Sequence, residues 1–384
     1  MTTALVLSGG GARAAYQVGI LRALARLLPA RTHNPFPIIC GTSAGAVNAL
    51  SLAGQPGPFR HRVASLVKIW RELEPNQVYR TDLIGVLRNS ARLAASLMRG
   101  GHAPSRAVAL LDNAPLRTLL ERHVHFRHID EALASGELDA VCVTAMNYAS
   151  GQSVSFFQGR QAPWKRNRRR GERAGLSIDH LLASAAIPIL FPSMRIGDSH
   201  YGDGALRQLR PLSPALRLGA DRLFVIGVSD NPLHQASEAP SKHPPPVGQI
   251  LGHMLNSAFI DSMEGEIEGL ETVNLLTRQL GGPVVQDDRL LRPIETLCIS
   301  PSQPLDRIAA DHIHELPLSM RLFLRSIGAT SESGGASAAS YLLFDAGFCR
   351  RLIALGYADA MAQRHGIAAF FGLPGPGITP GDTP

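Results

Sequence analysis

Residues 37–47, PIICGTSAGAV, join a short apolar run to a helix of small side chains that extends to Leu52. An earlier stretch of the chain repeats this order. The apolar run from Ala4 to Leu7 leads into a glycine turn, and Ala14 to Leu28 follow with apolar side chains at helical spacing. Strand, turn and helix, twice in succession, predict a parallel sheet with helices packed on it.

Further strand-like runs alternate with helical stretches along the rest of the chain. The strand-like runs are residues 139–144, 153–158, 222–229 and 295–300. The helical stretches are an arginine-rich cap from Arg60 to Glu121 and long helices over 250–280, 305–327 and 338–363. This pattern predicts an α/β protein with a mainly parallel central sheet and a helical C-terminal extension.

A polar, proline-rich stretch marks the predicted domain boundary. Residues 230–249, DNPLHQASEAPSKHPPPVGQ, have the composition of a long loop or linker. We therefore expect an N-terminal domain over 1–230, a linker over 231–249 and a mainly helical region over 250–370 that packs on the first domain. The Gly- and Pro-rich end, 371–384, is predicted to be a disordered tail.

The composition is that of a globular protein. The 384 residues are 45% hydrophobic, and 38 Lys and Arg against 31 Asp and Glu give a net charge of 38 − 31 = +7. A chain of this length buries about three quarters of its unfolded surface, so a large core is expected. A disordered or fibrous chain is thereby excluded.

The cysteines and the N-terminus predict a cytoplasmic protein. Cys40, Cys142, Cys298 and Cys349 form no C-x-x-C pair, and three of them lie in apolar runs, as buried thiols in a reducing compartment do. The first residues lack the basic region of a signal peptide. The longest charge-free window, residues 36–59, is broken by Gly, Pro, Ser and Asn, so we expect no transmembrane helix.

The turn Gly41-Thr-Ser-Ala-Gly45 carries the pattern G-x-S-x-G between the predicted strand and helix. A serine on such a sharp turn needs neighbours without bulky side chains, so that its hydroxyl projects above the sheet. The bare pattern also occurs by chance, and a tight turn without chemistry is the alternative. Its place between strand and helix favours Ser43 as a nucleophile.

The run Ser8-Gly-Gly-Gly-Ala-Arg13 ends the first strand and opens the first helix. Successive glycine amides at a helix N-terminus form a cradle for an anion. The anion is either a nucleotide phosphate or the oxyanion of an acyl intermediate. The dinucleotide spacing fails because Ala14 stands where its last glycine belongs, which favours the oxyanion.

Asp203 lies between two glycines in the segment Tyr201-Gly-Asp-Gly-Ala205. An Asp-Gly pair is usually a turn. No histidine of this chain stands in a motif that matches the serine, however, and a nucleophilic serine needs a base. A carboxylate can act as that base when burial raises its proton affinity and it lies within hydrogen-bond reach of the hydroxyl.

Together these segments resemble the patatin-like phospholipase family. Gly9-Gly-Gly-Ala-Arg13 resembles its oxyanion loop, Gly41 to Gly45 its nucleophile elbow and Asp203-Gly204-Ala205 its D-G-[GA] motif, over about residues 4–210. Residues 183–192, ASAAIPILFP, are similar to a further block of the family.

The resemblance implies a three-layer α/β/α fold and a lipid acyl hydrolase without metal or organic cofactor. It implies Ser43 as nucleophile and Asp203 as base in a dyad without histidine. The amides of Gly9, Gly10 and Gly11, with Arg13, would hold the oxyanion. The sequence leaves phospholipid, lysophospholipid and simple carboxylic esters open as substrates.

A basic segment predicts a second kind of contact. Residues 160–173 concentrate seven cations and Trp164 in a loop-like stretch, which suits the anionic surface of a membrane. A flexible solvated loop is the alternative. No groove-reading motif accompanies these cations, so we expect no specific nucleic-acid partner.

Two groups of histidines and acids lack the spacing of metal ligands, so no metal site is expected. They are the histidines at 123, 125 and 128 and the cluster at 311–315.

Two other functions stay open at this point. The first is an α/β-hydrolase with a Ser-His-Asp triad that draws on a histidine such as His253 or His312. The second is a non-catalytic protein that binds lipid or phosphate through the glycine cradle and the basic segment.

Overall fold

The computed structural model describes residues 1–98, 109–228, 244–286, 289–329 and 336–374. Within these ranges the main sheet has ten strands, and the path through eight of them runs β12-β9-β1-β2-β3-β4-β6-β5. The central strands are β1 (Thr3–Leu7), β2 (Ile38–Thr42), β3 (Ala140–Asn147), β9 (Arg222–Ile226) and β12 (Glu295–Ile299), all parallel to their neighbours in this group. The others are β4 (Ser153–Gly159), β5 (Trp164–Arg166), β6 (Arg169–Arg173), β7 (Met194–Ile196) and β8 (Ser199–Asp203).

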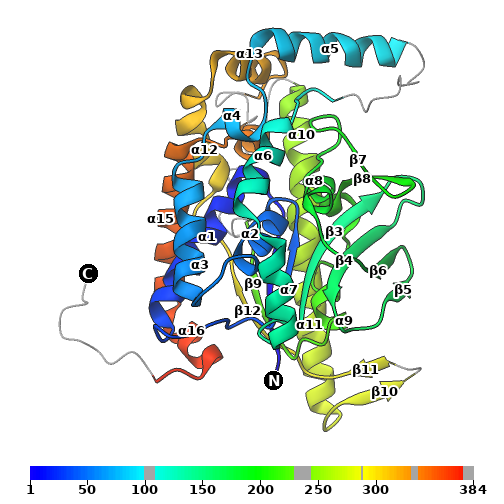
Figure 1. Cartoon of the computed structure of the whole chain (residues 1–384), viewed down its shortest axis with the longest axis vertical. Coiled ribbons are helices and arrows are strands. Elements are labelled where there is room, and N and C mark those ends of the chain that lie inside the picture. The colour runs from blue at the N-terminus through cyan, green and yellow to red at the C-terminus, as the bar shows by residue number, and fades with distance from the viewer. Residues whose placement is uncertain (99–108, 229–243, 287–288, 330–335, 375–384) are drawn as a thin grey trace, which may run out of the picture.

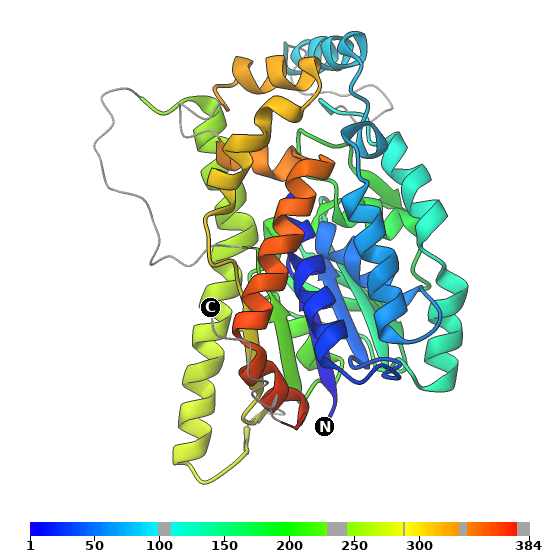
Figure 2. The ribbon, with the colours of Figure 1, turned by 90° about the vertical axis from the view of Figure 1, so that its left-hand side faces the viewer.

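Helices cover both faces of this sheet, which confirms the predicted α/β class (Figures 1 and 2). One core lies between the sheet and the helices α1 (Ala15–Leu27), α2 (Ala44–Ala53), α3 (Phe59–Arg71) and α15 (Ala346–Ala362). A smaller core lies on the opposite face, under α9 (Ser213–Arg217) and α11 (Ser262–Gln279). Strand β1 serves both cores because Leu5 and Leu7 point to one face and Ala4 and Val6 to the other.

The cap and the C-terminal region supply the remaining helices. Those of the cap and the segment after it are α4 (Pro75–Val78), α5 (Leu83–Met98), α6 (Ala114–His123), α7 (Phe126–Ser135) and α8 (Ile178–Ser184). Those of the C-terminal region are α10 (Val247–Asn256), α12 (Leu305–His312), α13 (Leu318–Ser326), α14 (Ala336–Leu342) and α16 (Arg364–Phe371). A small hairpin of β10 (Val284–Gln286) and β11 (Arg289–Leu291) follows α11.

The predicted long helices are each broken in the structure. The helix over 250–280 is divided by a π-helical turn at Ser257–Asp261, between α10 and α11. The helix over 305–327 stops before Pro317, which cannot donate a helical hydrogen bond. The helix over 338–363 is interrupted before Asp345, whose carboxylate caps α15 by accepting the Gly347 N–H at 2.7 Å. The prediction of helix in these three stretches was correct, but the breaks within them were not predicted.

The basic segment 160–173 is a β-hairpin rather than a loop. Its strands, β5 and β6, pair antiparallel at the edge of the sheet. Trp164 lies flat against Phe157, with ring centroids 5.1 Å apart and planes inclined by 21°. The loop prediction was therefore wrong: stacking of Trp164 on the sheet and pairing with β6 give the segment regular structure.

The C-terminal region completes the main fold. Its strand β12 pairs in parallel with β9, in register from Glu295 with Arg222 to Ile299 with Ile226. Its helix α15 packs along α1. The domain boundaries stay a prediction; most of the predicted linker, 231–243, and most of the predicted tail, 375–384, lie outside the described residues. All four cysteines are unpaired, as expected, and Cys298 is the one that is not fully buried.

The packing of α1 on α15 depends on two glycines that face each other across the interface. A Cβ on Gly19 would lie 2.2 Å from the Ile353 carbonyl oxygen, and a Cβ on Gly356 would lie 2.2 Å from the Tyr16 carbonyl oxygen. Real Cβ atoms do not approach so closely. The two backbones therefore touch only because neither residue has a side chain.

We expect Gly19→Ala to destabilise the protein by about 1–3 kcal/mol, because the added methyl group forces α1 and α15 apart. Thermal unfolding followed by circular dichroism measures the effect. Gly265→Ala, in α11, is the matched control: its Cβ would meet nothing within 4 Å, so helix propensity alone should stabilise that variant slightly. Equal melting temperatures for both variants would contradict the close approach.

Candidate active site

Ser43 occupies the turn between β2 and α2 in a strained backbone conformation. Its φ is 55° and its ψ is −129°, a region that side-chain-bearing residues rarely adopt. The Ser43 N–H donates to Ser184 Oγ at 2.8 Å, and Ser184 Oγ donates to the Thr144 carbonyl at 2.6 Å. The strained turn is thus fixed to α8 and β3 by a buried hydroxyl.

The glycines on either side of the serine are required by close packing. A Cβ on Gly41 would lie 2.4 Å from the Gly45 carbonyl oxygen. A Cβ on Gly45 would lie 2.4 Å from the carbonyl oxygens of both Leu7 and Ser8. The first turn of α2 therefore lies directly against the end of β1, as the sequence pattern predicts for a strand-to-helix elbow.

Asp203 ends β8 and is completely buried. Its Oδ1 accepts the Ala205 N–H at 3.0 Å, whereas its Oδ2 has no hydrogen-bond partner among the described residues. Burial raises the pKa of Asp203 to about 7, against the opposing effects of the Ser43 hydroxyl and the Ala205 amide. The structure thus brings the two residues of the predicted dyad together, 160 positions apart in sequence.

The glycine run lies beside the serine. A Cβ on Gly9 would be 3.0 Å from Ser43 Cβ, so these two residues are in contact. Gly11 has a φ of 55° and opens the short 3₁₀ turn Gly11–Ala14 before α1. Within the described part of the chain, none of the amides of Gly9, Gly10 and Gly11 donates a hydrogen bond to another residue. These three amides are therefore available to a ligand, and Gly9 is the residue of the run that lies against Ser43.

Arg13 lies in a different environment from that predicted. Its Nε donates to Ser340 Oγ at 2.7 Å, and its guanidinium stacks on the Tyr341 ring at 4.3 Å. Its backbone N–H donates to the Gly10 carbonyl at 3.1 Å. The side chain is directed to α14, in the C-terminal region. The hydroxyl that it binds there, Ser340 Oγ, belongs to no sequence motif. Arg13 thus joins α14 to the glycine run.

An apolar pocket opens at the serine. Ser43, Ala44 and Val47 lie at one end, and helices α3, α4 and α6 form much of its wall. The other lining residues include Leu66, Trp70, Leu73, Val78, Leu116, Leu119, Leu120, His123, Ile187, Phe191 and Phe344. Nearly all of these lining side chains are aliphatic or aromatic. Such a pocket can take an aliphatic chain.

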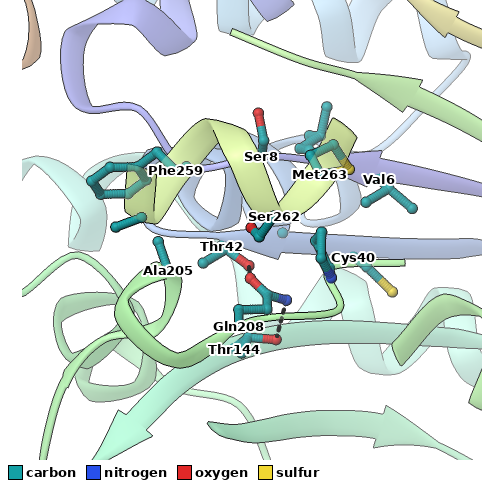
Figure 3. A pocket seen from close by; sticks show the side chains of 15 residues that line it. Val6, Ser8, Cys40, Thr42, Thr144, Ala205, Gln208, Phe259, Ser262 and Met263 are labelled. Carbon is teal, nitrogen blue, oxygen red and sulfur yellow. Dashed lines mark hydrogen bonds between the residues drawn. The ribbon is translucent and has the colours of Figure 1, made fainter. Parts of the chain in front are cut away.

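A second, smaller cavity lies under the nucleophile turn (Figure 3). Thr42 Oγ1 donates to Gln208 Oε1 at 2.5 Å, and Gln208 Nε2 donates to Thr144 Oγ1 at 3.3 Å. These bonds tie the end of β2 and the middle of β3 to the turn that follows Asp203. Phe259 and Met263 cover the cavity from the π-helical turn and α11.

Several residues of the site were missed by sequence reasoning. Ser184 lies within the recognised block 183–192, so a signal for it was present, but its role as acceptor of the Ser43 amide was not inferred. Phe259, Tyr341 and Phe344 carry no motif. They come from the C-terminal region, and the Phe259 ring packs so closely on Gly9 that a Cβ there would lie 2.5 Å from it.

The histidines of the described residues do not join the site as a triad would require. None of them forms a hydrogen bond with Ser43 or Asp203. His312 is instead paired with Glu315 at 3.1 Å and packs on Phe348. Over the same residues, no group of three or more His, Cys, Asp or Glu side chains could hold a metal ion.

No described helix has both the length and the apolar character needed to span a bilayer.

The model of the family described as patatin-like phospholipase matches residues 5–216, which is more than half of the chain. The chain therefore belongs to this family. The match contains all the sequence motifs described above and ends after the turn that follows Asp203.

A relative and two solved structures are similar over different parts of the chain. A cGAMP-activated phospholipase of Pseudomonas aeruginosa is 27% identical over 203 residues, 53% of this chain and 52% of that protein. The chain thus aligns with about half the length of this relative. Human GIVD cytosolic phospholipase A2 is 13% identical, with a TM-score of 0.44 over 96% of this chain and 60% of that one. VipD of Legionella pneumophila is 13% identical, with a TM-score of 0.34 over 95% and 67%.

The burial of Asp203 predicts a pH-dependent cost to stability. The carboxyl loses its proton near its ordinary pKa of 3.8 when unfolded, but only near 7 when folded. Between these pH values the folded state holds the additional proton, so stability falls as the pH rises and is lowest above pH 7. Asn at this position is uncharged at every pH.

We therefore expect Asp203→Asn to melt several degrees above the wild type at pH 8, and the difference to shrink towards pH 4. Thermal unfolding of both proteins at the two pH values measures it. Glu266, whose pKa burial also raises to about 7, is present in both proteins and cancels in the comparison. A difference that stays constant with pH would show that Asp203 is ionised in the fold throughout.

Proposed function

We propose that this protein hydrolyses lipid esters through a Ser43–Asp203 dyad. The observation that carries the proposal is the pairing of a strained, buried Ser43 with a carboxyl whose burial raises its pKa to about 7. A structural turn needs neither a desolvated carboxyl nor a serine at positive φ. Both features cost stability, and such costs are concentrated at functional sites.

In this proposal Asp203 acts as the general base. Its carboxylate takes the proton of the Ser43 hydroxyl as Ser43 Oγ attacks the carbonyl carbon of the ester. The tetrahedral intermediate collapses to an acyl-enzyme, and Asp203 returns the proton to the departing alcohol. A water molecule then repeats the attack with the same base, which releases the fatty acid and restores the Ser43 hydroxyl.

The glycine run stabilises the negative charge that develops on the carbonyl oxygen. The amides of Gly9, Gly10 and Gly11 are free to donate, and Gly9 touches Ser43. Donors that are already oriented cost no reorganisation when the oxyanion forms. Arg13 is left out of this oxyanion hole because α14 occupies its guanidinium.

The pocket indicates the part of the substrate that binds next to Ser43. Its walls are almost entirely aliphatic and aromatic, which suits the hydrocarbon chain of a fatty acyl group. The acyl group is therefore proposed to lie among α2, α3 and α6. The basic hairpin β5–β6 exposes Lys165, Arg166 and Arg168, so its contact with an anionic membrane also stays a proposal.

We expect Ser43→Ala to lower ester hydrolysis about 10³-fold or more, and Asp203→Asn to lower it comparably, because each removes one half of the dyad. Labelling by a fluorophosphonate, with the modified peptide identified by mass spectrometry, should place the adduct on Ser43 in the wild type. The adduct should be nearly absent from Asp203→Asn. The activity of the wild type should rise with pH through about 7, as Asp203 ionises.

Each open alternative predicts a different result. Under the triad mechanism, replacement of one histidine by Gln would abolish activity, whereas the dyad tolerates each such variant. Under the binding-only function, the wild type would bind lipid vesicles, cleave no ester and take up no fluorophosphonate. Activity of Ser43→Ala near the wild-type value would overturn the proposed nucleophile.

The acyl site can be tested at Val47, one turn along α2 from Ser43. Val47→Phe should shorten the pocket, because this side chain lines it and is only half-buried. We expect kcat/KM to fall at least about tenfold for long-chain p-nitrophenyl esters and to change little for the butyrate ester. Equal losses on both esters would contradict the proposed acyl site.

A further inference from the structure

Three helices lie together at one end of the molecule, far from the N-terminus. These are α5 and α13, which lie at the top of both views, and α10, which lies below them (Figures 1 and 2). We call this surface the helical end. It is connected to the apolar pocket through α4, whose Val78 lines the pocket and which leads into α5. Ser319 Oγ donates to the Thr81 carbonyl at 2.5 Å and so ties α13 to the same connection.

Helix α10 exposes large apolar side chains to solvent. Val247, Ile250 and Met254 follow one another at helical spacing and are 65%, 46% and 64% exposed. The opposite side of α10 packs through glycines: a Cβ on Gly248 would meet the Ala329 backbone at 2.7 Å, and one on Gly252 would meet Ala338 N at 3.2 Å. The helix thus buries its glycines and exposes its hydrophobic stripe.

The neighbouring helices extend this apolar surface. Leu318 and Leu322, one turn apart on α13, are 61% and 44% exposed. Met98, the last residue of α5, is 90% exposed. A single exposed leucine is ordinary on a protein surface, but exposed apolar side chains on two helices that meet, α10 and α13, indicate an interaction face.

Within α5, α10 and α13 the acidic side chains are missing and the charged side chains are arginines. Arg88 and Arg92 on α5 and Arg325 on α13 are exposed, and Arg321 is half-exposed. In contrast, α11 carries Glu264, Glu266, Glu268 and Glu271. Helices with apolar side chains, arginines and no acids bind at the interface of anionic bilayers.

We propose that the helical end docks on the surface of a membrane that contains anionic phospholipid. The apolar side chains of α10 and α13 enter the acyl boundary, and the arginines contact the phosphate groups. This inference rests on the proposed function, because lipid esters reside in bilayers. A face joined to the pocket through α4 places Ser43 near its substrate.

The basic hairpin is less suited to this role. Its aromatic side chain, Trp164, is stacked on Phe157 and so is committed to the sheet. Its exposed side chains are mainly cationic, which gives electrostatic attraction without an apolar anchor. The hairpin also forms the edge of the sheet, away from α5 and α13 (Figure 1).

The test measures vesicle binding in a Ser43→Ala background, so that no lipid is consumed. Vesicles of phosphatidylcholine alone, or with added phosphatidylglycerol, are sedimented with the protein. We expect the triple variant V247S/I250S/M254S to lose at least about tenfold in affinity for the mixed vesicles. The matched control is L275S/L276S/L280S, which removes three exposed leucines from the far end of α11 and from the residue after it, and should bind as before.

Charge-reversal variants and activity assays form the second part of the test. R321E/R325E should weaken binding to the mixed vesicles more than the hairpin variant R166E/R168E does. With Ser43 present, V247S/I250S/M254S should hydrolyse a soluble p-nitrophenyl butyrate at the wild-type rate but cleave vesicle phospholipid more slowly. Unchanged vesicle binding by this variant would overturn the proposal.

Other outcomes distinguish the helical end from the basic hairpin, and a membrane from a second copy of the chain. Loss of binding in R166E/R168E alone would assign the membrane contact to the hairpin. No vesicle binding by the parent, with a change from dimer to monomer in V247S/I250S/M254S on sedimentation velocity, would make the face an interface between two copies of the chain. Vesicle binding without any ester cleavage by the protein containing Ser43 would overturn the proposed function and leave the docking face standing.

Discussion

The contact between the first turn of α2 and the end of β1 is the constraint on which the site depends. Gly45 lies against the carbonyl oxygens of Leu7 and Ser8, so that a single methyl group at this position would separate helix from strand. The same contact holds Ser43 at positive φ and places it against Gly9. The relative positions of Ser43 and the glycine run therefore follow from one backbone approach.

The strain at this turn is balanced by hydrogen bonds from more distant segments. Ser184 accepts the Ser43 amide and reaches the Thr144 carbonyl, while the Thr42–Gln208–Thr144 chain fixes the turn after Asp203 to the sheet. Buried polar networks of this kind are rigid when each member has a partner. Among the described residues, Asp203 Oδ2 is left without one.

The C-terminal region is part of the same structural unit as the motifs. It adds β12 to the sheet, packs α15 on α1 through Gly19 and Gly356, and covers the glycine run with Phe259 and Tyr341. It also contributes Phe344 to the apolar pocket and α10 and α13 to the helical end. The half of the chain that carries the motifs thus supplies the proposed dyad, and the other half supplies part of the pocket wall and covers the glycine run.

The sequence by itself determined the alternation of strands and helices, the elbow around Ser43, the glycine run and Asp203, because these rest on local patterns and on steric rules of short range. It did not determine the helix breaks, the pairing of β5 with β6 or the partner of Arg13, since each depends on a segment distant in the chain. Only the tertiary structure decided that Asp203 is desolvated, because burial is set by all the elements packed around a residue. It likewise decided that α10 exposes its apolar stripe: the periodicity of a helix gives a face, but only its neighbours decide which face is covered.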